Sequence, residues 1–103
     1  MQAVKVQYTV QPSFADTNAA NIKMLMNALK AKPIEGVNYA VFRLDDNQTF
    51  VHIVVAQNET ARLALTNLPE FKAFQTALKE SRPISPPLAE EWNVVGASFE
   101  STE

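Results

Sequence analysis

Two neighbouring stretches of this sequence are apolar on both faces. Residues 37–44 and 49–56 have the length and the β-branched and aromatic content of strands, and the polar residues between them indicate a hairpin turn. Successive strand side chains point to opposite faces. In the second stretch, Val51, Ile53 and Val55 therefore share one face, and the apolar residues on the other face are Phe50, Val54 and Ala56. A sheet with one face in water would alternate apolar with polar residues. Both faces of this hairpin therefore need a cover.

The segment before the hairpin predicts a strand and then a helix. Residues 4–10 alternate apolar and polar side chains, as in a strand with one wet face, and Pro12 ends this pattern. Farther along, apolar residues recur at the spacing of one helix face: Ile22, Leu25, Met26 and Leu29. Pro33 should end this helix, because the residue before a proline avoids the helical conformation.

The segment after the hairpin predicts a second helical region and a last strand. Its apolar residues keep helical spacing on both sides of Pro69, which should interrupt or restart the helix. Three of the six prolines then lie within residues 82–87, which we interpret as a stiff, extended connection. The last strand is predicted at residues 92–99, which are again rich in apolar residues.

This order of elements, βαββαβ, predicts the fold. Two right-handed βαβ crossovers joined by a hairpin give an α+β, ferredoxin-like domain, which is a four-stranded antiparallel sheet with the helices on one face. A single domain of this kind would account for residues 1–103. A second copy packed on the other face would cover it, and large uncovered apolar faces are rare on monomers. We therefore expect a homodimer.

Composition excludes several kinds of partner and chemistry. The net charge of −2 and the lack of a basic block argue against a nucleic acid or an anionic membrane as partner. The absence of cysteine excludes disulfides, thiolate metal sites and cysteine nucleophiles. Two glycines are too few for a phosphate-binding loop. With no visible signal peptide and no stretch as apolar as a membrane span, we expect a cytoplasmic protein without a metal or other cofactor.

Several short motifs resemble one known family. Gly36 precedes a tyrosine-bearing strand, an acidic turn follows, and Phe50 opens the next strand. The second helical region then carries Leu-Pro-Glu-Phe-Lys-Ala-Phe at residues 68–74. In this order and spacing the motifs resemble the antibiotic biosynthesis monooxygenase domain of the dimeric α/β-barrel superfamily, over residues 3–99. The resemblance implies a homodimer with one small-molecule pocket per subunit, and oxidation of quinol-like aromatics by oxygen without an added cofactor.

The chain departs from those enzymes at several positions. Many members end the third strand with an acidic residue and a tryptophan. The positions that look equivalent in this chain hold Val54 and Ala56. Many also have a histidine where this chain has Glu70. The haem-degrading branch uses an asparagine, a tryptophan and a histidine, and the corresponding residues here look like Val6, Ala56 and Gln75. We therefore expect no haem degradation, and a pocket enlarged where alanine replaces tryptophan.

His52 is the only histidine and is our candidate for a catalytic residue. It has the strand parity of Phe50 and Val54, and the resemblance gives the pocket-facing tryptophan of the enzymes the same parity. We expect the imidazole to face a pocket on the helix side, where its neutral form could take or give a proton near pH 7. The alternative is a buried structural histidine that makes a hydrogen bond.

Aromatic side chains are the candidate ligand contacts. Tyr8 and Trp92 combine aromatic bulk with a polar tip, which suits a flat organic ligand, and Phe50 and Phe74 are predicted to contact the ligand with them. All four are also common core residues. Arg43, near the end of an apolar strand, should either pair with a carboxylate or bind an anionic ligand.

Two functions of different classes stay open. The first is a cofactor-independent oxygenase or isomerase that acts on a small aromatic or enolisable molecule, with His52 as the proton-transfer group. The second is a non-catalytic dimer that binds a small apolar ligand, or none. Three other users of this fold are excluded. The chain lacks the basic and aromatic strand motif of an RNA-recognition domain, the paired cysteines of a copper chaperone and the arginine-bearing loop of an acylphosphatase.

Overall fold

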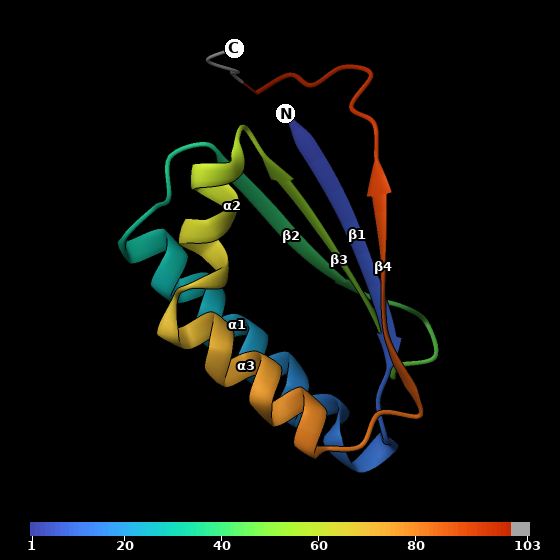
Figure 1. Cartoon of the computed structure of the whole chain (residues 1–103). Coiled ribbons are helices and arrows are strands. Elements are labelled where there is room, and N and C mark those ends of the chain that lie inside the picture. Colours follow the sequence, from blue (N-terminus) through green and yellow to red (C-terminus); the bar gives the residue numbers. More distant parts are fainter. Residues whose placement is uncertain (100–103) are drawn as a thin grey trace.

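The computed structural model describes residues 1–99, in which a four-stranded antiparallel sheet carries three α-helices on one face (Figure 1). The elements are β1 (Gln2–Thr9), the 3-10 turn η1 (Pro12–Phe14), α1 (Ala15–Ala31), β2 (Val37–Arg43), β3 (Thr49–Ala56), α2 (Glu59–Thr66), α3 (Pro69–Glu80) and β4 (Ser85–Trp92). The strand order is β2-β3-β1-β4. The predicted α+β, ferredoxin-like fold is confirmed, with the sheet open rather than closed on itself.

The turn of the β2–β3 hairpin sets the register of the two strands. Asp46 accepts hydrogen bonds from two backbone N–H groups of the turn through Oδ1, at 2.9 and 2.8 Å. Asn47 adopts a positive φ of 61°, which asparagine tolerates better than most residues. With the turn closed in this way, Tyr39 lies opposite Val54. Because Val54 is two residues from His52 on β3, Tyr39 and His52 share one face of the sheet.

Proline and asparagine residues set the limits of the later helices. Asn58 precedes α2, and its side chain accepts a hydrogen bond from the backbone N–H of Ala61 at 2.8 Å, which satisfies one donor of the first turn. The helical region is then interrupted, and α3 begins at Pro69, whose missing N–H is not needed at a first helical position. The predicted restart at this proline is confirmed.

The hydrophobic core lies between the helices and the inner face of the sheet. Its buried members come from β1, α1, β3, α3 and the segment between β1 and α1: Tyr8, Val10, Ala15, Ile22, Phe50, Phe74 and Leu78. The helix stripe predicted on α1 contributes Ile22 and Leu25, both buried. The core is concentrated on one side of the sheet.

The last strand differs from the sequence-based prediction, which placed it at residues 92–99. β4 instead runs through the proline-rich segment, and residues 93–99 form no strand. The physical reason is the position of β4 at the edge of the sheet, where a proline can be accommodated because its missing N–H is not needed. Pro86 and Pro87 also lie where the register between β1 and β4 shifts, so an irregularity in the pairing accommodates them.

The outer face of the sheet, on the side away from the helices, is largely apolar. Cross-strand pairing places these apolar residues on it: Ala3, Ala40, Phe42, Val51, Ile53, Val55, Leu88 and Trp92. Phe42 and Leu88 are 52% and 69% exposed, so nothing in the described chain covers them. None of the helices of residues 1–99 is long and apolar enough to cross a membrane.

Candidate functional site

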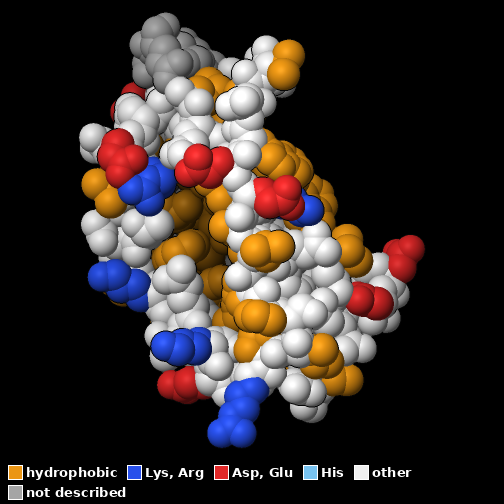
Figure 2. Space-filling view, turned by 45° about the vertical axis from the view of Figure 1, so that its right-hand side comes forward, with side chains coloured by type: hydrophobic (Ala, Val, Ile, Leu, Met, Phe, Trp, Pro, Cys, Tyr) orange, Lys and Arg blue, Asp and Glu red, His pale blue; other side chains and the backbone are white. Residues whose placement is uncertain are grey.

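A cavity of about 370 Å³ lies between the inner face of the sheet and α3. Figure 2 shows a hollow with hydrophobic side chains on its walls and charged side chains of both signs around its opening. The strands contribute Val6, Tyr8, Tyr39, His52 and Val54. Helix α3 supplies much of the opposite wall, and Pro83, which precedes β4, completes the lining with Pro86 and Pro87 of β4. The cavity is therefore mostly apolar, with its polar groups concentrated on the sheet side.

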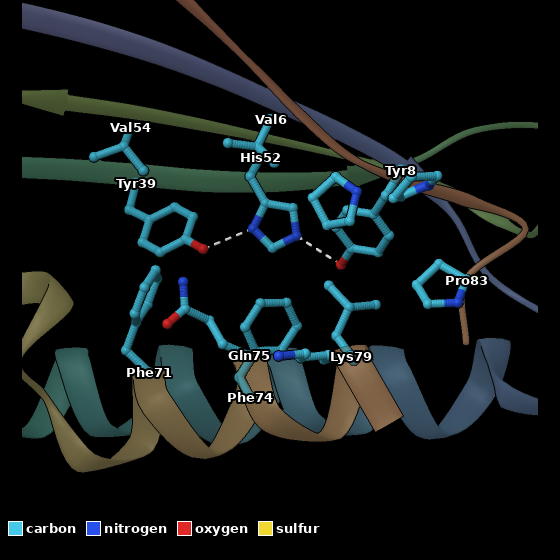
Figure 3. Close-up of a pocket in the computed structure, with 13 residues that line it drawn as sticks. Val6, Tyr8, Tyr39, His52, Val54, Phe71, Phe74, Gln75, Lys79 and Pro83 are labelled. Atoms are coloured by element: carbon cyan, nitrogen blue, oxygen red, sulfur yellow. Dashed lines mark hydrogen bonds between the residues drawn. The ribbon is translucent and has the colours of Figure 1, made fainter. Parts of the chain in front are cut away.

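A chain of hydrogen bonds runs along the sheet side of this cavity. The Tyr8 hydroxyl lies 2.8 Å from His52 Nε2, and the Tyr39 hydroxyl lies 2.6 Å from His52 Nδ1. Figure 3 shows the two tyrosines on either side of the imidazole. From α1, Asn18 Nδ2 donates a hydrogen bond to the Tyr8 hydroxyl oxygen at 2.9 Å. Four side chains from four elements thus form one chain, in the order Asn18, Tyr8, His52, Tyr39.

Three of the four side chains are buried, Tyr39 is partly buried, and the titratable groups of the chain are neutral near pH 7. Asn18, Tyr8 and His52 are 0%, 1% and 4% exposed. Burial lowers the pKa of His52 to about 4 from an ordinary value of 6.5, because the charged imidazolium loses its hydration. Burial also raises the pKa of Tyr8 and of Tyr39 above the usual range of tyrosine. The site therefore offers uncharged hydrogen-bonding groups.

Aromatic rings surround the imidazole and form the apolar part of the site. The ring centroids of His52 and Phe74 are 5.3 Å apart, and those of Tyr39 and Phe71 are 6.5 Å apart. Figure 3 shows Phe71, Phe74 and the polar residue Gln75 on the helix opposite His52. Aromatic side chains at these separations suit a flat, conjugated ligand, because ring faces and edges attract one another.

The structure brings together three of the five predicted site residues. His52, Tyr8 and Phe74 all line the cavity on the helix side of the sheet. Phe50 lies in the core, 2% exposed, where its ring stacks on Tyr8 with centroids 5.7 Å apart. Trp92 lies on the outer face, with Lys5 Nζ 5.8 Å from the centroid of its ring. A role of any of the five toward a ligand stays a prediction.

Of two other expectations about positions, one was wrong and one was met. The alanine expected to enlarge the pocket, Ala56, is buried and does not line the cavity, whereas Val54 does. Arg43 pairs with a carboxylate, the first of the two alternatives expected for it. Its guanidinium lies 3.1 Å from Asp16 Oδ1 of α1 and 5.5 Å from the ring centroid of Phe50.

Sequence reasoning missed two members of the hydrogen-bonded chain. Tyr39 could have been found from the hairpin register, because a four-residue turn at positions 45–48 places Val41 opposite His52. Tyr39, two residues from Val41, then shares the face of His52. Asn18 lies four residues before Ile22 and continues the apolar stripe of α1, so a polar residue in a buried stripe was the available signal. Gln75, which also lines the cavity, had been matched to a site histidine of the haem-degrading branch, whereas Lys79 had no comparable signal.

The described side chains bring together no group of three or more histidine, aspartate or glutamate residues that could hold a metal ion. Asp46, the best-bonded carboxylate of the hairpin turn, accepts hydrogen bonds from the turn itself.

Comparison with known proteins gives likeness in structure but not in sequence. No family profile matches the sequence, and no curated protein matches it either. Among solved structures, an antibiotic biosynthesis monooxygenase superposes with a TM-score of 0.79 at 15% identity, covering 93% of this chain and 100% of that one. Rv0793 from Mycobacterium tuberculosis gives 0.79 at 12% identity, covering 95% and 98%.

A cofactor-independent oxygenase is also similar in structure. SnoaB from Streptomyces nogalater, a cofactor-independent oxygenase, superposes with a TM-score of 0.70 at 18% identity, covering 96% of this chain and 97% of that one. Identities this low carry the fold and leave the chemistry to the site itself. The chain therefore has the fold of the antibiotic biosynthesis monooxygenases.

Proposed function

We propose that this chain forms a homodimeric enzyme that binds a small, flat, oxygen-bearing aromatic molecule in the cavity and promotes its oxidation by O₂ without a cofactor. The observation that carries the proposal is the pair Tyr39–His52, a polar element set in an otherwise apolar cavity lined by aromatic rings. Pockets that combine apolar walls with a few convergent polar groups are the usual form of small-molecule sites. The likeness to SnoaB adds support at the level of fold.

The rings of the cavity bind the substrate's aromatic system, and the Tyr39 hydroxyl meets its oxygen atom. A naphthol illustrates the reaction. The ring C–H para to the hydroxyl becomes a carbonyl, one atom of O₂ enters that carbonyl, and the other leaves as water with the two hydrogens that the naphthol loses. The substrate supplies all four electrons that O₂ takes up, so no further reductant is needed. The protein's part is to hold the substrate and to stabilise negative charge on its oxygen.

His52 acts through Tyr39 in this proposal. Both ring nitrogens of His52 already lie within hydrogen-bond distance of tyrosine hydroxyls, so the imidazole has no free nitrogen to offer a substrate directly. Its bond to Tyr39 holds that hydroxyl at the cavity wall. His52 is thus proposed as a positioning residue, and Tyr39 as the group that touches the substrate.

The homodimer is proposed from the outer face of the sheet. The exposed apolar residues there, with Phe42 and Leu88 more than half exposed, resemble a core surface without its cover. A second copy of the same face is the natural cover, because an isologous interface pairs a patch with itself. We expect at least roughly 2,000 Å² of total buried surface, as in obligate dimers.

A non-catalytic binding dimer is the second candidate, and one observation favours it. Apart from Gln75 and Lys79, the polar side chains that line the cavity are the tyrosines and His52, which bond to one another. Such a cavity can bind an apolar molecule without acting on it. Binding that is unaccompanied by oxygen uptake would identify this function.

The test uses purified wild-type protein in chelator-treated buffer with 1-naphthol as probe and labelled ¹⁸O₂ as oxidant. We expect oxygen uptake and one labelled oxygen in the product 1,4-naphthoquinone. Tyr39→Phe, which removes only the hydroxyl, should lower turnover by about 10²-fold, as expected for loss of one donor to a developing oxyanion. Lys23→Ala, at an exposed position on α1, is the matched control and should keep wild-type turnover.

Two outcomes would overturn the enzymatic proposal. In the first, 1-naphthol binds stoichiometrically but oxygen is not consumed, which leaves the non-catalytic binding dimer. In the second, Tyr39→Phe turns over 1-naphthol as fast as wild type while circular dichroism shows an intact fold, which removes Tyr39 from the chemistry.

A further inference from the structure

We propose that Asn18 sets the direction of the hydrogen-bonded chain, so that Tyr39 presents its hydroxyl hydrogen to the cavity and selects a ligand oxygen that accepts a hydrogen bond. Such oxygens are those of a ketone, a quinone or a phenolate. The location of the ligand rests on the proposed function, whereas the direction of the chain is a property of the four side chains alone.

The direction follows from counting hydrogens at His52. A neutral imidazole has one N–H donor and one bare nitrogen that accepts. Its two nitrogens lie 2.8 Å from the Tyr8 hydroxyl and 2.6 Å from the Tyr39 hydroxyl. One tyrosine must therefore donate to the ring while the other accepts from it. Two states are thus possible. In one, Tyr8 donates to Nε2 and Nδ1 donates to Tyr39; in the other, Tyr39 donates to Nδ1 and Nε2 donates to Tyr8.

Asn18 makes this choice because it is a donor to Tyr8. Asn18 Nδ2 donates to the Tyr8 oxygen at 2.9 Å, and Asn18 Oδ1 is buried and accepts no hydrogen bond. Tyr8 is 1% exposed, so its single hydrogen needs a partner within the protein. With Asn18 supplying a hydrogen to its oxygen, Tyr8 directs its own hydrogen to His52 Nε2.

The rest of the chain follows from that step. Because Nε2 accepts, the imidazole hydrogen lies on Nδ1 and is donated to the Tyr39 oxygen. The Tyr39 hydrogen is then left without a partner in the chain, and the Tyr39 side chain forms part of the cavity wall (Figure 3). A ligand oxygen placed there meets a donor. Asn18 is a positioning residue in this account, since it acts through Tyr8, His52 and Tyr39.

The selectivity that results distinguishes acceptors from donors. A quinone or a phenolate oxygen can receive the Tyr39 hydrogen, and a phenolate gains further because its charge strengthens the bond. A ligand without an oxygen leaves the Tyr39 hydrogen unpaired in an apolar cavity, which is unfavourable. The site should therefore favour a ligand with an acceptor oxygen at this position over one that has none.

The direct test is nitrogen NMR of wild-type protein labelled with ¹⁵N-histidine at pH 7. The sequence has one histidine, so the two ring nitrogens of His52 give the only side-chain signals. We expect the hydrogen on Nδ1 and a bare Nε2. A hydrogen on Nε2 would overturn the proposal, because Tyr8 would then accept from His52 and Tyr39 would donate to it.

A variant reverses the chain and tests the selectivity. Asn18→Asp at pH 8 replaces the amide by a carboxylate that only accepts, so Tyr8 should donate to residue 18 and the His52 hydrogen should move to Nε2. 1,4-Naphthoquinone, which only accepts, should bind about tenfold more weakly to Asn18→Asp and to Tyr39→Phe than to wild type. Lys23→Ala should bind it as wild type does.

The outcomes separate this proposal from the proposed function. If His52 carries its hydrogen on Nδ1 but 1-naphthol is not oxidised, the direction of the chain stands and the oxygenase falls. If 1-naphthol is oxidised while the hydrogen lies on Nε2, the oxygenase stands and the role of Asn18 falls. Unchanged quinone binding in a folded Asn18→Asp would also overturn the selectivity.

Discussion

Lowering the pH from 7 to 5 should weaken the fold, because His52 takes up a proton much less readily in the folded protein than in the unfolded chain. Burial holds the folded pKa at about 4, against 6.5 in the unfolded chain. Between these two values the unfolded state binds a proton that the folded state does not. The contribution of His52 to stability is therefore complete above the ordinary value of 6.5 and is lost as the pH falls toward about 4.

The magnitude follows from the two pKa values. A tenfold difference in proton affinity corresponds to about 1.4 kcal/mol, so His52 can remove about 3 kcal/mol from the free energy of unfolding. About 2 kcal/mol of this should be lost by pH 5. Small domains have a free energy of unfolding of roughly 5–15 kcal/mol in total, so the loss is a large share. Protonation also costs the neutral ring its acceptor role toward one tyrosine.

The assay is urea unfolding followed by circular dichroism at pH 8, 7, 6 and 5, at one protein concentration so that any dimerisation contributes equally. His52→Gln, which keeps a polar side chain but does not titrate, is measured in parallel. The subtraction is needed because Asp46 and Glu59 have lowered pKa values and add their own loss in acid. Equal pH dependence in wild type and His52→Gln between pH 7 and 5 would refute the reasoning, as would an NMR titration of His52 near pH 6.5.

Three further substitutions test other parts of the structure. Ile53→Asp places a charge in the middle of the outer face and should convert the proposed dimer to a monomer in light scattering. Val95→Asp, at a fully exposed position, should leave the dimer intact. A wild-type protein that is monomeric at micromolar concentration would contradict the dimer. Val54→Phe fills part of the cavity and should abolish binding of 1-naphthol in calorimetry without lowering Tm, so retained binding would place the ligand elsewhere. Phe50→Ala should lower the free energy of unfolding by about 3–5 kcal/mol, and a loss below 1 kcal/mol would show that the core differs from the one described here.

The order of the elements could be predicted from the sequence because hydrophobic periodicity reports directly on burial. The apolar, β-branched and aromatic residues of 37–44 and 49–56 indicated a hairpin, and the fold has it at β2 and β3. The last strand could not be found in this way. Two prolines argue against a strand in general, and only knowledge that β4 lies at an edge makes them acceptable.

The candidate site could be predicted only where the alternation of side chains along a strand was enough to place a residue on one face of the sheet. The parity of His52 placed it on the helix side, which the structure confirms. Trp92 was predicted as a ligand contact from its aromatic bulk and polar tip alone, whereas pairing with Ala3 puts it on the outer face. Asn18 comes from a different element, and its hydrogen bond to Tyr8 depends on how α1 packs on the sheet, which no local pattern of the sequence encodes.

The two prolines of β4 bear on how copies of this chain can meet. A free sheet edge carries unpaired N–H and C=O groups, and a second chain can add to them as an extra strand. Because successive N–H groups of a strand point to opposite sides, the adjacent residues Pro86 and Pro87 together leave the free edge one donor short, and the shift in register beside them interrupts its regular spacing. Continuous strand addition along β4, the first step toward a growing aggregate, is therefore disfavoured at these residues. In the proposed homodimer, by contrast, association through the face of the sheet ends once two copies have met.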